Sequence, residues 1–243
     1  MKIGYDVFGK SYGIMLRNDV HAGNSIDDIF IREMVLLDDD SYLYLYSQIK
    51  RFDMTQHELF GFAGQFRGKT DRETITKVIK FTSEIAMEYN VDFKDMLFGG
   101  TELQIIERGT DWCADMARVC AVLLQCCNIP CRIVHLANLE KAYNGHVVCE
   151  AYYEGRYGII DPIYGYMFYD NVPISAYDVT KNKKHLQQYG DGENYGGLYS
   201  AIAINEYDPT NGKNVYTVSA PNAYYLKLIY TEHNDQWIMG EDR

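Results

Sequence analysis

The sequence predicts an α+β fold in which helices come first and an antiparallel sheet follows. An apolar helical pattern at residues 113–126 is preceded by several helix-start signals, and strand-like runs begin at residue 131. Two of these runs, 146–153 and 156–160, are separated by only two residues, as in a β-hairpin. Because helices and strands are grouped along the chain, we expect the 113–126 helix to pack on an antiparallel sheet.

The N-terminal part is predicted to be mostly helical. Roughly the first 35 residues mix glycine with short β-like runs, so we expect a sheet segment or an irregular arm there. Acidic residues before Ser41 indicate a helix at 42–52, and Thr-x-x-Glu capping boxes at Thr55 and Thr70 indicate two more. The last of these is amphipathic and extends to about residue 90.

The helix at 113–126 has a predicted end as well as a start. Asn128 follows it in the manner of a left-handed cap, and Pro130 comes shortly after. A strand at 131–136 should then lead to the hairpin strands.

The hairpin register can be derived from its turn. With Glu154 and Gly155 as the two loop residues, Tyr153 pairs with Arg156 and Val148 faces Asp161. His146 is then a diagonal neighbour of Asp161 on one face, about 7 Å away and within reach of a hydrogen bond. The opposite face should pack against the 113–126 helix; its residues are Val147, Cys149, Ala151 and Ile160.

The C-terminal part is predicted to add strands at 198–207 and 214–219, joined by a turn at 208–212. Between the hairpin and these strands lies a glycine-rich segment at 190–197. We interpret it as either a lid over the site or a long surface loop.

Composition and charge exclude several classes of partner. The chain has 243 residues, of which 47% are hydrophobic and 23% charged, and its net charge is −11. This balance disfavours nucleic acid and anionic membrane surfaces. The N-terminus lacks a continuous apolar segment and no later apolar run approaches the ~20 residues of a membrane span, so we expect a cytoplasmic protein. The sequence leaves the oligomeric state open.

Six cysteines are present, and we expect reduced thiols because the chain is too long for a small disulfide scaffold. The spacing of Cys126, Cys127 and Cys131 matches no zinc pattern, so we expect neither a metal nor a cofactor.

Cys113, His146 and Asp161 are the candidate catalytic residues. Cys113 begins the apolar helix, where the helix dipole and free N–H groups favour a thiolate. His146 can act as its base, and Asp161 can orient the imidazole. Each has a plainer interpretation on its own: a packed cysteine, a satisfied strand histidine and a turn-starting aspartate. Their combination in this order favours the catalytic hypothesis.

At these residues the chain resembles the transglutaminase-like superfamily, which is related to papain. The family motifs are Cys-x-Asp-x-Ala, His-x-x-x-Glu and Asp-Pro, and the resemblance covers about residues 70–162. The matching residues are Cys113, Asp115, Ala117, His146, Glu150, Gly155, Asp161 and Pro162. It implies a papain-like core at about 70–165 of one domain spanning 1–243, with elaborations at 1–66 and 166–243.

Departures from the family pattern concern the substrate side of the site. Asp111 stands where the family usually has glycine, and Val148 and Tyr157 replace aromatic positions that are often tryptophan. We take these three and Tyr164 as candidate substrate-binding residues. A second oxyanion donor is assigned to Gln104 or Trp112, beside the backbone N–H of Cys113. Two further carboxylates are given supporting roles: Glu150 is interpreted as an outer or surface-facing group, and Asp115 as a partner of the helix dipole.

Three functions remain open at this point. The first is a peptidase or amidase that forms a thioester with a peptide, protein or small amide substrate. The second is an acyltransferase, either a transglutaminase or an amide synthase, in which an amine replaces water. The third is a binding or scaffold module that retains the fold without catalysis.

Overall fold

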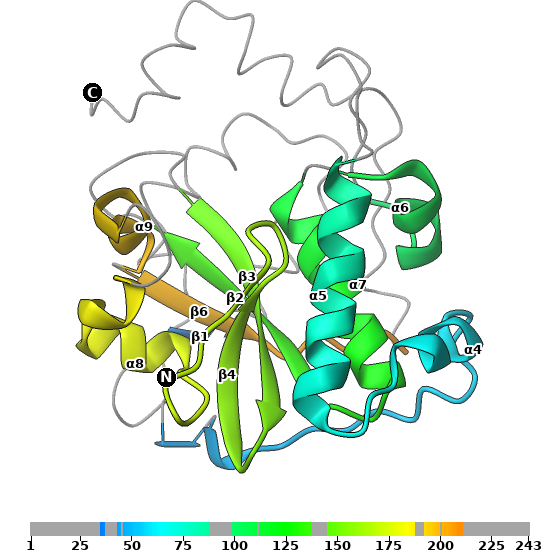
Figure 1. Ribbon diagram of the computed structural model, residues 1–243, viewed down its shortest axis with the longest axis horizontal. Helices are drawn as coiled ribbons and strands as arrows, with labels where there is room; N and C mark the ends of the chain where they lie inside the picture. The colour runs from blue at the N-terminus through cyan, green and yellow to red at the C-terminus, as the bar shows by residue number, and fades with distance from the viewer. Residues whose placement is uncertain are drawn as a thin grey trace, which may run out of the picture.

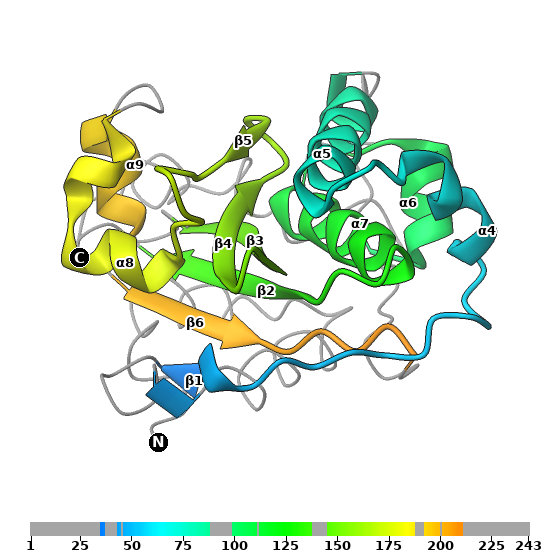
Figure 2. The same cartoon turned by 60° about the horizontal axis from the view of Figure 1, so that its bottom comes forward.

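The computed structural model describes residues 35–36, 43–44, 46–87, 99–110, 112–137, 145–187, 192–199 and 201–210. Helices and an antiparallel sheet form separate layers, so the predicted α+β class is confirmed (Figures 1 and 2). One group of helices covers one face of the sheet, and the later helices α8 and α9 lie on its other side.

The described part of the sheet has six strands in the order β1-β6-β2-β3-β4-β5, and each pair is antiparallel. The long strands β2, β3 and β4 are adjacent at its centre. The strands are β1 (Val35–Leu36), β2 (Cys131–Ala137), β3 (Gly145–Tyr153), β4 (Arg156–Asp161), β5 (Tyr166–Met167) and β6 (Ala201–Asn205).

The helices that the structure describes fall on either side of the long strands in the sequence. Before them come α4 (Phe60–Ala63), the 3-10 helix η2 (Gly64–Phe66), α5 (Asp71–Met87), α6 (Glu102–Arg108) and α7 (Cys113–Cys126). After them come α8 (Ala176–Lys181), the 3-10 helix η4 (Lys183–Leu186) and α9 (Gly192–Leu198). None of these helices is both long and apolar enough to cross a bilayer.

The predicted hairpin register is confirmed. Tyr153 pairs with Arg156, and the pairing continues to Cys149 and Ile160. Glu154 and Gly155 have φ values of 50° and 85°, the left-handed conformations that a type I′ turn requires.

The sheet separates two cores, and helix α7 packs on one of its faces. The core on its side contains Val147, Cys149, Ala151 and Ile160, as the alternation predicts, and α5 packs on the outer side of α7. Val148 and Ile159 point to the other face, into the core beneath α8 and α9. The sheet is therefore covered on both faces.

The ends of α7 and the start of α5 follow the sequence signals. Asn128 has φ 67°, and the N–H of Ile129 donates to the carbonyl of Leu124 at 2.9 Å, which closes the helix as a Schellman cap. The Thr70 hydroxyl accepts from the N–H of Glu73 at 3.2 Å at the start of α5.

Two predicted helices before α5 are corrected. Thr55 begins a turn, because its N–H and hydroxyl both donate to Asp53, and α4 begins only at Phe60. In the predicted helix at 42–52, helical conformation is described only at 43–44 and 46–47, and none at 48–52. The Gln48 carbonyl instead accepts from the Tyr157 hydroxyl, which ties this segment to the sheet.

The glycine-rich segment is a helix in its described part, not a surface loop, and its role as a lid stays a prediction. Residues 192–198 form α9, which packs over the second core through Tyr195. The described strand that follows is 201–205, shorter than the predicted 198–207.

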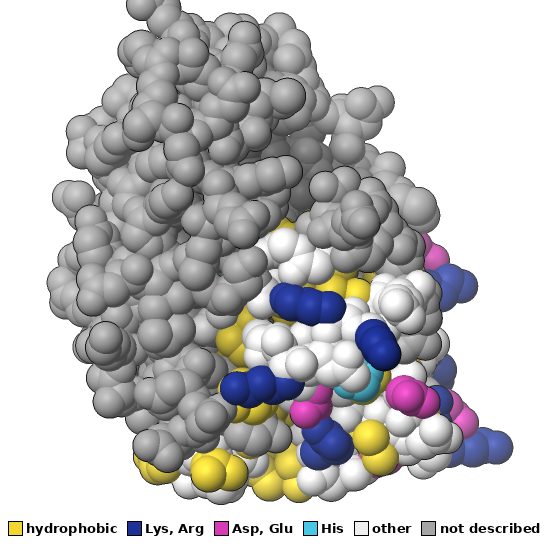
Figure 3. All heavy atoms as spheres, turned by 90° about the vertical axis from the view of Figure 1, so that its left-hand side faces the viewer, with side chains coloured by type: hydrophobic (Ala, Val, Ile, Leu, Met, Phe, Trp, Pro, Cys, Tyr) yellow, Lys and Arg dark blue, Asp and Glu magenta, His cyan; other side chains and the backbone are white. Residues whose placement is uncertain are grey.

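Exposed lysines on α8 and η4 contribute to this side of the molecule, where Lys and Arg side chains gather (Figure 3). The expected N-terminal arm and the strand at 214–219 lie outside the described residues.

Candidate active site

His146 and Asp161 form a buried hydrogen-bonded pair at neighbouring strands. His146 is on β3 and Asp161 is the last residue of β4, with exposed fractions of 8% and 0%. The imidazole Nε2 lies 2.9 Å from the carboxylate Oδ2. The hairpin therefore produces the predicted contact.

The Asp161 carboxylate is oriented by donors on both oxygens. Its Oδ1 accepts from the backbone N–H groups of Ile163 at 3.1 Å and Tyr164 at 3.3 Å. Its Oδ2 accepts from the Tyr195 hydroxyl in addition to His146. These donors satisfy a charge that is removed from solvent.

Cys113 is the first residue of α7. Its side chain is partly exposed and lies close enough to the imidazole to raise the pKa of His146. Burial lowers the pKa of His146, but hydrogen bonds to Asp161 and Cys113, together with their negative charges, raise it to about 10. The surroundings of the ring therefore favour its protonated form.

The start of α7 leaves its first donors available. Trp112 is the N-cap in an extended conformation, and its side chain makes no capping bond. Its own N–H donates to the Thr110 hydroxyl at 3.0 Å. Because the cap does not use them, the first-turn N–H groups around Cys113 can stabilise negative charge.

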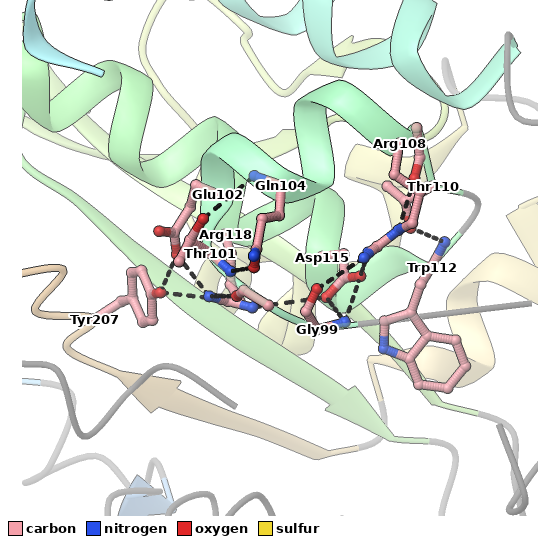
Figure 4. Close-up of polar contacts among 12 residues, drawn as sticks. Gly99, Thr101, Glu102, Gln104, Arg108, Thr110, Trp112, Asp115, Arg118 and Tyr207 are labelled. Atoms are coloured by element: carbon pink, nitrogen blue, oxygen red, sulfur yellow. Dashed lines mark hydrogen bonds and ion pairs between the residues drawn. The ribbon is translucent and has the colours of Figure 1, made fainter. Parts of the chain in front are cut away.

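Asp115 anchors this helix start to the preceding segment (Figure 4). It is fully buried and accepts from the N–H of Gly99 at 2.8 Å and from Arg108 Nη2 at 3.0 Å. Burial raises its pKa, and the charge of Arg118 is the largest opposing effect. The carboxylate therefore has neighbours other than the helix dipole and faces the protein interior.

A second buried group extends the same support one turn further along α7. Arg118 Nη2 donates to Glu102 Oε1 and to the Gly100 carbonyl, both at 2.8 Å. Its Nε donates to the Tyr207 hydroxyl at 2.9 Å, and Tyr207 in turn donates to Glu102 (Figure 4). Segments at 99–102 and 207 are thereby fixed against α7.

The two candidate oxyanion donors have different surroundings. Gln104 closes the N-terminal cap of α6, where its side-chain oxygen accepts from the N–H of Thr101 at 2.9 Å (Figure 4). Trp112 is next to Cys113 and packs against the core beneath α7. Donation to an oxyanion stays a prediction for both residues.

The candidate substrate-binding residues differ in burial, which decides whether each can contact a substrate. Val148 is fully buried, and Tyr157 is 2% exposed with its ring under the Arg132 guanidinium, so neither offers a surface to substrate. Tyr164 is 55% exposed, and its ring centroid lies 5.8 Å from that of His146. Asp111 lies outside the described residues.

Glu150 is not a surface-facing carboxylate. It is fully buried, and its Oε2 accepts from Arg132 Nε at 3.0 Å and Nη2 at 2.8 Å. Its Oε1 accepts from the N–H of Ala176 at 2.7 Å and from the Tyr46 hydroxyl. The covered second face of the sheet explains this burial.

Tyr195 is the site residue that sequence reasoning missed. It lies in the sequence Glu-Asn-Tyr-Gly-Gly, whose glycines favour a loop, yet the chain forms α9 there and buries the ring. Only the tertiary contact with Asp161 distinguishes it from the many other tyrosines.

Comparisons with known proteins add little to this geometry. No protein-family model matches the chain, and no curated protein matches it. Among solved structures, a crystal structure from Cytophaga hutchinsonii, described as a candidate cysteine protease, is similar at 22% identity and a TM-score of 0.36. The match covers 52% of this chain and 43% of that chain, and a likeness this weak carries no information about activity.

Proposed function

We propose that the protein is a cysteine-nucleophile hydrolase that cleaves an amide or peptide bond through a thioester at Cys113. One observation carries the proposal: His146 hydrogen-bonds the Asp161 carboxylate through Nε2, and Cys113 is close enough to the same ring to raise its pKa. A nucleophile, a base and an orienting carboxylate in contact are the parts that covalent acyl transfer requires.

Acylation begins with the sulfur of Cys113 as a thiolate beside the protonated imidazole. The sulfur attacks the carbonyl carbon, a C–S bond forms, and the carbonyl π electrons move to the oxygen. The N–H of Cys113 at the α7 N-terminus stabilises this oxyanion. When the oxyanion collapses, the C–N bond breaks and His146 gives its proton to the leaving nitrogen, which departs as the amine.

Deacylation reverses the roles of the imidazole. His146, now neutral, takes a proton from a water molecule while the oxygen of that water attacks the thioester carbon. The second oxyanion collapses, the C–S bond breaks, and the acid is released with the thiolate and imidazolium restored. Asp161 keeps the ring oriented and stabilises its charged form in both steps.

Access to the pair favours a substrate that approaches past Tyr164. The Cys113 side chain is partly exposed, whereas His146 and Asp161 are buried behind it. The exposed Tyr164 ring lies beside His146 and packs in a stacked arrangement with Tyr166 at 6.0 Å between centroids. An acyl group bound to Cys113 would therefore contact an aromatic surface on this side.

The proposal is tested by trapping the acyl-enzyme with p-nitrophenyl acetate. Intact-protein and peptide mass spectrometry should find one acetyl group on Cys113, with a burst of p-nitrophenol that Cys113→Ala abolishes. Cys127→Ala is the matched control, because Cys127 is buried and its thiol donates to the Ala63 carbonyl, away from His146, and this variant should retain the burst. Acetylation spread over several thiols, or a burst that survives Cys113→Ala, would refute the proposal.

The same acetyl-enzyme distinguishes water from an amine as acceptor. Added glycine methyl ester should leave acetate as the main product of a hydrolase. N-acetylglycine methyl ester as the main product would identify an acyltransferase instead.

A further inference from the structure

The residue that shares the Asp161 carboxylate with His146 comes from a separate element. Tyr195 on α9 donates its hydroxyl to Oδ2, the same oxygen that Nε2 of His146 contacts. Its ring is 8% exposed and its centroid lies 6.2 Å from that of His146 and 5.5 Å from that of Tyr164. Tyr195 therefore contacts the pair through both its hydroxyl and its ring.

The position of Tyr195 is held by packing and by an anchor on α9. Its ring stacks on Phe168 at 6.4 Å between centroids, within the core beneath α8 and α9. Lys183 of η4 donates to the carbonyls of Gly196 at 2.9 Å and Tyr199 at 2.6 Å, which holds the C-terminal end of α9. Helices α8 and α9 lie on the side of the molecule that is viewed in Figure 3.

We propose that Tyr195 is a positioning residue that, by sharing Oδ2 with His146, limits how strongly Asp161 holds the imidazole proton. It acts through Asp161 and deepens the proposed function, on which its catalytic meaning rests. A donor on a carboxylate stabilises the anion and withdraws charge from the oxygen. A second donor on the same oxygen therefore weakens the ionic bond to the first.

This role matters because a strongly held proton slows both steps of acyl transfer. His146 must give its proton to the leaving nitrogen and later take one from water, and both are fastest when its pKa is near the working pH. Asp161 and the nearby Cys113 already raise the pKa of His146 to about 10. The Tyr195 hydroxyl opposes a further rise without removing the orienting carboxylate.

The other titratable groups near His146, Asp161 and Tyr195 are Cys113 and three tyrosines. Cys113 of α7 and Asp161 of β4 act on His146, and Tyr164 lies against both of those groups. Tyr166 lies beside Tyr164, and Tyr199 beside Tyr195. Removing the Cys113 side chain leaves Asp161 as the carboxyl group that faces His146 among these groups.

The test is an NMR titration of ¹⁵N-labelled His146 in the Cys113→Ala protein. Adding Tyr195→Phe, which keeps the ring and removes the hydroxyl, should raise the pKa of His146 by roughly half a pH unit. In a protein that also carries Asp161→Asn, the same change should have no effect, because the carboxylate charge through which Tyr195 acts on His146 is gone. An unchanged or lowered pKa with Asp161 intact would overturn the proposal.

Tyr207→Phe is the matched control. Tyr207 is also a buried tyrosine, 4% exposed, whose hydroxyl donates to a carboxylate, that of Glu102. Loss of the Tyr207 hydroxyl should lower the free energy of unfolding as Tyr195→Phe does, while leaving the His146 titration unchanged. An equal shift in both variants would show a general structural effect and refute the role of Tyr195.

A second measurement needs no substitution at Tyr195. In the Cys113→Ala protein, the ¹³Cζ resonance of Tyr195 should move with the midpoint of the His146 titration, whereas that of Tyr207 should not. A Tyr195 ¹³Cζ chemical shift that does not change at the midpoint of the His146 titration would overturn the proposal. Both measurements lack the nucleophile, so their outcome is independent of whether Cys113 forms an acyl-enzyme.

Discussion

Glu150→Gln should lower the free energy of unfolding by about 3–5 kcal/mol, because it breaks a fully buried ion pair on one side only. Glu150 and Arg132 both have side chains that are 0% exposed, and every described contact of the carboxylate is with a donor. The ion pair joins β2 to β3, and the Glu150 carboxylate also accepts a hydrogen bond from the first N–H of α8.

The magnitude follows from counting donors. An amide carries one oxygen, so in either rotamer its NH₂ group faces former donors: Arg132 on one side, or the Ala176 N–H and the Tyr46 hydroxyl on the other. Two buried donors then lose their acceptor, at about 1–3 kcal/mol each. Arg132 retains only the longer, 3.3 Å contact to Glu206 among its described carboxylate partners.

The assay is urea unfolding followed by circular dichroism, with Glu84→Gln as the matched control. Glu84 pairs with Lys80 across an exposed helix surface, where the side chains are 49% and 78% exposed, so its loss should cost under about 0.5 kcal/mol. The double variant Arg132→Met, Glu150→Leu removes the Arg132 donors but also the acceptor of the Ala176 N–H and the Tyr46 hydroxyl, so it should recover only the part of the loss that Arg132 causes. A cost below about 1 kcal/mol for Glu150→Gln would refute the reasoning.

Three further changes have defined outcomes. Gly158→Ala should cost about 1–3 kcal/mol in the same assay, because its Cβ would meet Pro173 Cβ at 2.6 Å; a loss under about 0.5 kcal/mol would contradict that packing. Burial lowers the pKa of His135 to about 3. Below about pH 6.5, His135 therefore takes up a proton in the unfolded chain but not in the folded protein. The free energy of unfolding should fall by up to about 1.4 kcal/mol per pH unit as the pH drops through this range. His135→Gln should remove that slope, and parallel pH curves would contradict it. Asp161→Asn should slow alkylation of Cys113 at pH 6 by about tenfold or more, measured with iodoacetamide, and an unchanged rate would exclude a role for the carboxylate.

The hairpin and the α7 helix were predictable because short-range rules determine them. The Glu154-Gly155 turn permits one register, and that register places His146 beside Asp161. Asn128 marks the helix end through its left-handed conformation. Local turn chemistry thus determines most of the candidate pair.

The parts that sequence reasoning missed depend on contacts between distant segments. Burial of Glu150 requires α8 and α9 on the second face, which strand alternation alone does not indicate. The helix around Tyr195 forms despite its glycines, because Lys183 and the core beneath α9 hold it. Thr55 shows the opposite case, since the side chain of Asp53 competes for the donors that a helix cap would use.

The most direct test of the account is the pH dependence of Cys113 alkylation by limiting iodoacetamide, compared between the native protein and His146→Ala. We predict that native Cys113 reacts before the other cysteines and stays reactive at pH values well below the ordinary thiol pKa of about 8.5. His146→Ala should reduce the rate at pH 6 by about tenfold or more, because the imidazolium that stabilises the thiolate is gone. A Cys113 that reacts like an ordinary thiol, with a rate indifferent to His146→Ala, would contradict the central claim.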